Sequence, residues 1–191
     1  MISLGLDIDK FVLKDAYFDQ KSTLHGQGHT CRVMFLCLLL GDRLDNVVDT
    51  RRALCAAFIH DMSRQHDGYC TEHGDWAVER KLPDFIGFFR SLGMSDEDLE
   101  AIALAVGNHS VKDEITENNP YYATVAILKD ADALDRIRLG SGNLNPEYLR
   151  YNESHSLIKL AKRLYYKTAG LELYSLRQVM EIGEVLLAET D

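Results

Sequence analysis

The residues of this chain best suited to chemistry are an adjacent histidine and aspartate, His60 and Asp61. They follow an apolar run over residues 53–59 and lead into a polar, turn-rich segment over 62–68. An imidazole and a carboxylate at the end of a buried helix cost free energy unless a partner compensates them. A divalent metal is such a partner, because neutral imidazole nitrogen and carboxylate oxygen both suit zinc, iron and manganese. Two residues do not make a site, so the other histidines and aspartates decide the interpretation.

Five further residues could take part in the same chemistry: His29, His73, His109, Asp130 and Asp132. His29 begins an apolar helix, and His109 continues the apolar stripe of the helix before it, so His109 is expected to face the core. Asp132 shares a helix face with apolar residues, whereas Asp130 lies roughly 200° around the helix and faces elsewhere. A single inward histidine is usually a hydrogen-bonded core residue, and a single inward aspartate is usually paired with an arginine or a helix end. Several such groups in an acidic chain need a common positive charge, which a metal centre supplies.

The elements that must hold these residues are helices. The chain has only three prolines, and apolar residues recur with a helical period almost everywhere, which predicts an all-α fold. Ser95 and Asp98 have the spacing of a capping box, which predicts the start of a helix. Residues 85–89 leave room for a short strand. The predicted helices cover residues 29–41, 48–60, 74–81, 95–109, 121–139, 146–167 and 174–188, with a polar loop over 62–72 and a stop near Pro83.

The composition narrows the class of protein. A net charge of −9 argues against a nucleic-acid polymer or a membrane surface as partner, although a small phosphorylated substrate fits if cationic groups gather locally. The longest apolar run, over residues 33–40, is far shorter than the ~18 residues of a membrane span, and no signal-peptide pattern precedes it. The four cysteines have no CxxC spacing, which is typical of reduced thiols in a cytoplasmic protein. At 191 residues the chain is expected to form one domain.

The order of these residues resembles a known family. His29 in His-Thr-Cys-Arg-Val, the His60-Asp61 doublet and Asp132 in Lys-Asp-Ala-Asp-Ala-Leu-Asp-Arg are similar to the H…HD…D pattern of the HD-domain metal-dependent phosphohydrolases. The resemblance runs over about residues 25–136. It implies an HD-domain helical bundle within a single domain over 1–191, with the metal site between central helices and two extra C-terminal helices over 140–191. The Ala-Asp-x-Leu element of the pattern selects Asp132 over Asp130.

The resemblance also implies a set of metal ligands. One divalent metal would be held by His29, His60, Asp61 and Asp132. In branches of the family that bind two metals, Asp61 would bridge to a second ion on His73 and His109. Manganese, iron, cobalt, nickel or zinc suits such ligands, with magnesium as a further option.

The substrate requires positive charge and hydrogen-bonding groups beside the metal. Arg64 is expected to act there as a catalytic and substrate-binding residue together with Asp61, the alternative being a surface ion pair. Arg136 would reach the same cavity or pair with Asp135. His25 and Gln27 are further substrate contacts if their loop is not simply solvated. Three residues are candidates for the acid that protonates the leaving group: His25, His66 and Asp67.

These patterns favour a phosphohydrolase that cleaves a phosphate mono- or diester of a nucleotide or small metabolite with metal-activated water. A second interpretation keeps the ligands but changes the reaction, because some HD relatives use two irons to activate oxygen. A third is a non-enzymatic nucleotide sensor on the HD fold, which would not need to retain the ligands. A small phosphorylated substrate is the expected partner, and a homodimer remains open.

Overall fold

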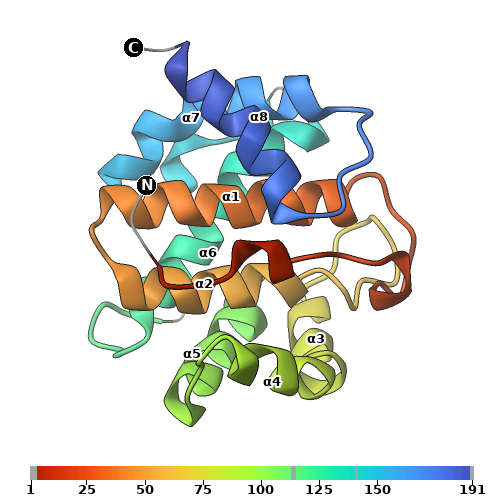
Figure 1. Cartoon of the computed structure of the whole chain (residues 1–191), viewed down its shortest axis with the longest axis vertical. Coiled ribbons are helices and arrows are strands. Elements are labelled where there is room, and N and C mark those ends of the chain that lie inside the picture. The colour runs from red at the N-terminus through yellow and green to blue at the C-terminus, as the bar shows by residue number, and fades with distance from the viewer. Residues whose placement is uncertain (1–3, 113–114, 141, 190–191) are drawn as a thin grey trace.

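Two central helices organise the computed structural model, which describes residues 4–112, 115–140 and 142–189. The apolar run after His29 lies in α1 (Gln27–Arg43), where every residue over 29–41 is buried. A turn at Asp45, with φ of 49°, and an Asn46 cap on the Asp49 N–H lead into α2 (Val47–Ile59). The two helices run antiparallel (Figure 1). They approach so closely that a Cβ on Gly41 would collide with Thr50.

The other helices surround this hairpin. They are α3 (His73–Arg80), α4 (Leu82–Ser91), α5 (Asp96–Asn108), α6 (Tyr122–Leu134), α7 (Asn152–Thr168) and α8 (Leu176–Ala188). On one side α5 packs against α2, with α3 against α5, and on the other side α7 and α8 pack against α1, while α6 packs against both central helices (Figure 1). The described residues contain no strand, only an isolated bridge between Val12 and Ser175, so the predicted all-α fold is confirmed.

The predicted elements differ from the observed ones in three places. The segment 85–89 is helical. Pro83 does not end a helix but lies in the first turn of α4, where its missing N–H needs no partner. The helix expected over 121–139 changes at Asp135 into a 3-10 helix, η3 (Asp135–Leu139). The helix expected from 146 begins only at 152, after a short 3-10 helix, η4 (Pro146–Tyr148), and an extended Leu149. The capping box of Ser95 and Asp98 is present.

The fold gathers the ends of α1, α2, α3, α5 and α6 at one end of the hairpin. His29 lies in the first turn of α1, and His60 and Asp61 directly follow α2, so the antiparallel pairing brings them together. His73 begins α3 and His109 directly follows α5. No helix among the described residues has the length and apolar character needed to cross a membrane.

Candidate metal centre

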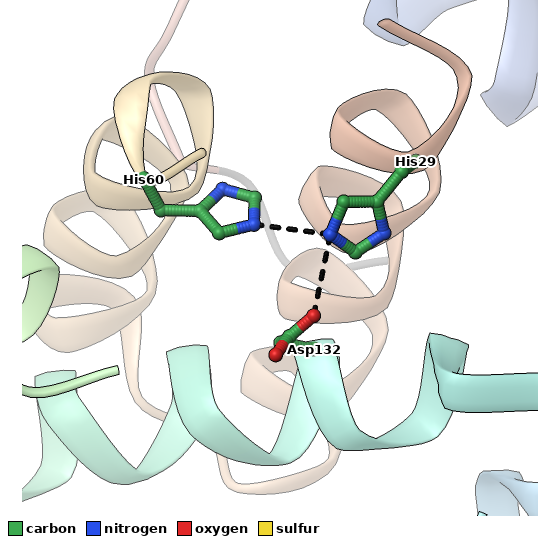
Figure 2. Close-up of side chains that lie close together, drawn as sticks. All are labelled: His29, His60 and Asp132. Carbon is green, nitrogen blue, oxygen red and sulfur yellow. Dashed lines mark hydrogen bonds and ion pairs between the residues drawn. The ribbon is translucent and has the colours of Figure 1, made fainter. Parts of the chain in front are cut away.

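Three side chains meet at the first position of the centre: His29 on α1, His60 directly after α2 and Asp132 on α6. The Nε2 atoms of His29 and His60 lie 3.1 Å apart, and Oδ1 of Asp132 lies 3.2 Å from Nε2 of His29 (Figure 2). All three ligand atoms lie within 4.8 Å of one another, so one ion could contact all of them.

A second position adjoins the first. Nε2 of His73 lies 2.9 Å from Nε2 of His109. This contact depends on Gly74, because a Cβ there would stand 2.5 Å from the carbonyl oxygen of Val106 and keep α3 away from α5. The absence of a side chain at Gly74 therefore lets the two helices bring the two imidazoles together.

Asp61 lies between the two positions with one oxygen toward each. Its Oδ2 is 3.3 Å from Nε2 of His29 and 3.6 Å from Nε2 of His60. Its Oδ1 is 3.0 Å from Nε2 of His73 and 3.6 Å from Nε2 of His109. A carboxylate in this orientation can bridge two cations.

The hydrogen bonds of the four imidazoles identify which nitrogen carries the proton. The Nδ1 atoms face oxygen acceptors at 2.6–3.1 Å, and these are Oδ2 of Asp135 for His29 and the carbonyls of Ala57, Cys70 and Val106 for His60, His73 and His109. Each Nδ1 is therefore a donor, and the Nε2 of each ring is the nitrogen that faces the centre. Four Nε2 atoms beside the carboxylates of Asp61 and Asp132 are ligands that transition metals prefer, so the donor set fits a metal.

The electrostatics of the first position also favour a cation. Although burial opposes its charged form, contacts with Asp132, Asp135 and Asp61 raise the pKa of His29 to about 9. Burial lowers the pKa of His60 to about 3, so this ring is neutral at pH 7. Burial also opposes ionisation of Asp61 and Asp132, but the histidines around both carboxylates, and Arg138 beside Asp132, hold both pKa values well below the ordinary value. Without a metal, a proton on His29 supplies the positive charge that these carboxylates need.

Asp135 and Arg32 hold the ring of His29 in place, and the sequence pattern did not predict this contact. Asp135 accepts from Nδ1 of His29 and from both Nε and Nη2 of Arg32, at 2.6 and 2.9 Å. Asp135 therefore pairs with Arg32 and not with Arg136. The spacing held a signal, since Asp135 follows Asp132 by three residues and Arg32 follows His29 by three.

A cavity of about 570 Å³ opens onto the centre, and Asp61, His73, His109 and Asp132 lie in its wall. Much of the remaining wall is cationic. Six basic residues line it: Arg64, Lys112, Lys129, Arg136, Arg138 and Arg150. In a chain of net charge −9, this cavity concentrates positive charge beside the candidate metal ligands.

The structure brings three of the four predicted substrate contacts to this cavity. Arg64 donates from Nε to Oδ1 of Asp61 at 3.0 Å, and Arg136 lines the wall. His25 also lines it, with Nδ1 2.9 Å from Oδ1 of Asp67. Gln27 does not reach the cavity, because its side-chain amide donates to the carbonyl of Leu13.

Two other aspartate and histidine positions are separate from the centre. Asp130 accepts from the main chain of Arg150 and from the Ser154 hydroxyl, so it anchors the start of α7, as its place on another helix face predicts. His66 accepts from the N–H of Gly68 and does not line the cavity, whereas Asp67 does.

Comparison with known proteins agrees with this arrangement. The HD domain family matches residues 26–137, a span that contains all the candidate ligands. Neither the curated proteins nor the solved structures include a significant match. The family match covers more than half of the chain, and the protein belongs to the HD domain family.

Proposed function

We propose that this protein is a metal-dependent phosphohydrolase that cleaves a phosphate mono- or diester of a nucleotide or related small metabolite. The observation that carries the proposal is the Asp61 carboxylate between two pairs of imidazoles whose Nε2 atoms converge. Membership of the HD domain family supports a hydrolase that depends on a divalent metal.

The ligand set supports one or two divalent ions. His29, His60, Asp61 and Asp132 would hold the first, and His73 and His109 would hold a second that shares Asp61. Divalent ions bound there would act as Lewis acids on the phosphoryl oxygens and lower the pKa of a bound water.

The basic residues of the cavity would attract and orient the anionic substrate. Arg64 donates to Asp61 and to the carbonyls of His66 and Gly68, so its guanidinium is held at the mouth of the site. Its fixed charge and those of the neighbouring basic residues would attract an anionic ester. This cationic wall favours a phosphate ester over an uncharged substrate.

The test begins with the metal content of the purified protein. A panel of phosphate mono- and diesters is then assayed with added manganese, cobalt, nickel, magnesium and iron. We expect release of phosphate or of a phosphomonoester with at least one metal. Two irons with oxygen consumption would instead support an oxygenase, and tight nucleotide binding without turnover on the whole panel would support a sensor.

Asp61→Ala tests the centre itself. Loss of the bridging carboxylate removes a ligand from both positions, so bound metal and turnover should disappear together. The matched control is Asp84→Ala, an exposed aspartate on α4 that does not line the cavity, which should retain both. Turnover that survives in Asp61→Ala would show that the site is elsewhere.

A further inference from the structure

Arg138 is a buried arginine at the centre whose guanidinium is only partly engaged. It lies in η3, its side chain is 5% exposed, and its Nε donates to the carbonyl of Leu24 at 2.8 Å. Its Nη1 is buried and has no hydrogen-bond partner. A buried charged donor without an acceptor is costly, so the structure retains a group that should gain an acceptor when a ligand binds.

The carboxylates near Arg138 do not supply that acceptor. Oδ1 of Asp132 is 3.5 Å from Nη1, close enough for attraction but without a hydrogen bond, and the same oxygen is directed at His29. Oδ2 of Asp135 is 4.0 Å from Nη1 and already accepts from Arg32 and His29.

Arg138 belongs to the wall of the cavity at the metal centre. Five buried side-chain atoms lack a partner in the described part of the chain, and they belong to Thr30, Arg51, Ser63, Asp132 and Arg138. Only the last two belong to residues of the cavity wall. One is a negative oxygen on the candidate metal ligand Asp132, and the other is a positive nitrogen beside it. The pair suits a cation and an anion bound side by side.

Other basic residues of the wall are engaged differently. Arg64 donates to Asp61, and Lys129 donates to the carbonyls of Asn108 and Val111 at 2.8 Å. Arg138 differs because its bond to Leu24 fixes the plane of the guanidinium while Nη1 has no acceptor. A planar, anchored fork of this kind recognises the oxygens of phosphate or carboxylate.

We propose that Arg138 is a phosphate-binding residue whose Nη1 donates to a non-bridging oxygen of the phosphoryl group held at the metal centre. This role rests on the proposed function for the identity of the anion. Arg138 forms no covalent bond in this role. It lies one residue beyond the matched span of the HD domain, so it is contributed by the segment that follows.

Binding of inorganic phosphate to the metal-loaded protein, measured by calorimetry, tests the role without requiring turnover. Arg138→Gln should weaken phosphate binding about 10- to 100-fold, as expected for loss of a charged hydrogen bond. Arg138→Lys should restore part of the affinity through its charge. The control is Arg51→Gln, because Arg51 also donates to one carbonyl, that of Leu92, and also has an unpartnered buried nitrogen, but does not line the cavity.

Metal content and thermal unfolding are measured on every variant. The proposal requires unchanged metal content and wild-type phosphate affinity in Arg51→Gln. Unchanged phosphate affinity in Arg138→Gln, or a loss of metal in that variant, would overturn it, since the latter would assign Arg138 to support of Asp132. Failure of the wild type to bind phosphate would also overturn it. If the wild type binds phosphate but cleaves no ester, the proposed function fails while the comparison of the variants still decides the role of Arg138.

Discussion

At the scale of single residues, the side-chain nitrogens explain why these histidines form a centre and not an ordinary polar core. A hydrogen-bonded core histidine uses both ring nitrogens on protein groups. Here each Nδ1 is bound to an oxygen, while the Nε2 atoms of His29, His60, His73 and His109 converge on Asp61. The second nitrogen of each ring therefore faces a shared carboxylate, the arrangement in which a cation can be held between them.

Asp135 is expected to control the first metal position through His29. Asp135→Asn keeps an oxygen near Nδ1 but removes the negative charge that orients the ring and binds Arg32. We expect metal affinity at the first position to fall about 10- to 100-fold, the usual effect of losing such a partner. Metal titration with a competing chelator measures this.

Asp130→Asn is the matched control for Asp135→Asn. Asp130 is also a buried carboxylate paired with an arginine, Arg150, but it contacts no imidazole. It should lose stability without losing metal affinity. Equal losses of metal affinity in the two variants would refute the role of Asp135.

At the scale of elements, the distance between α3 and α5 determines the second metal position. A methyl group at Gly74 would stand 2.5 Å from the carbonyl of Val106 and 3.1 Å from that of Gly107. These are backbone atoms, so α3 must move, and His73 moves with it.

Gly74→Ala should therefore lose the second metal and keep the first. Elemental analysis should show about one equivalent less metal than in the wild type under conditions that fill both positions. Gly87→Ala on α4 is the control, because a Cβ there meets no atom within 4 Å. Two metals retained in Gly74→Ala would mean that α3 can shift without separating His73 from His109.

At the scale of the whole molecule, stability depends on contacts that connect sequence-distant helices. Asp98 makes one of these contacts. It completes the capping box at the start of α5 and accepts from Nε of Arg52 on α2 at 2.6 Å. Burial opposes its ionisation, but hydrogen bonds from Ser95 and Arg52 lower its pKa below the ordinary value of 3.8.

The lowered pKa of Asp98 predicts a pH-dependent contribution to global stability. A carboxylate whose pKa is lowered by folding stabilises the fold at pH values above its ordinary, unfolded-state pKa. That stability is lost as the pH falls through the folded-state pKa. Asp98→Asn should reduce the free energy of unfolding by about 1 kcal/mol at pH 7, with the difference shrinking below about pH 4. Urea unfolding at several pH values measures it. Asp96→Asn, whose carboxylate is 83% exposed in the same helical turn, should have a smaller and flatter effect.

The all-α fold and most helix positions follow from the sequence, because apolar periodicity, proline positions and local caps act over a few residues. Ser95 and Asp98 illustrate this, since their hydrogen bonds lie within one turn. Local rules missed α4, because a proline can begin a helix as well as end one. They also missed the break before α7, where buried Asp130, about twenty residues earlier, accepts the main-chain N–H groups of Arg150 and Tyr151.

The sequence by itself determined which residues could form the centre, because a helical period and an ordered family pattern select His29, the His60-Asp61 doublet and Asp132. Only the tertiary structure decided how they meet. Three contacts between distant segments show this. Asp61 lies between two pairs of imidazoles, Asp135 pairs with Arg32, and the Gln27 amide donates to the carbonyl of Leu13. Periodicity defines one face of one helix. The atoms that face each other across helices depend on packing, which here includes a glycine at position 74 and a buried arginine at position 138.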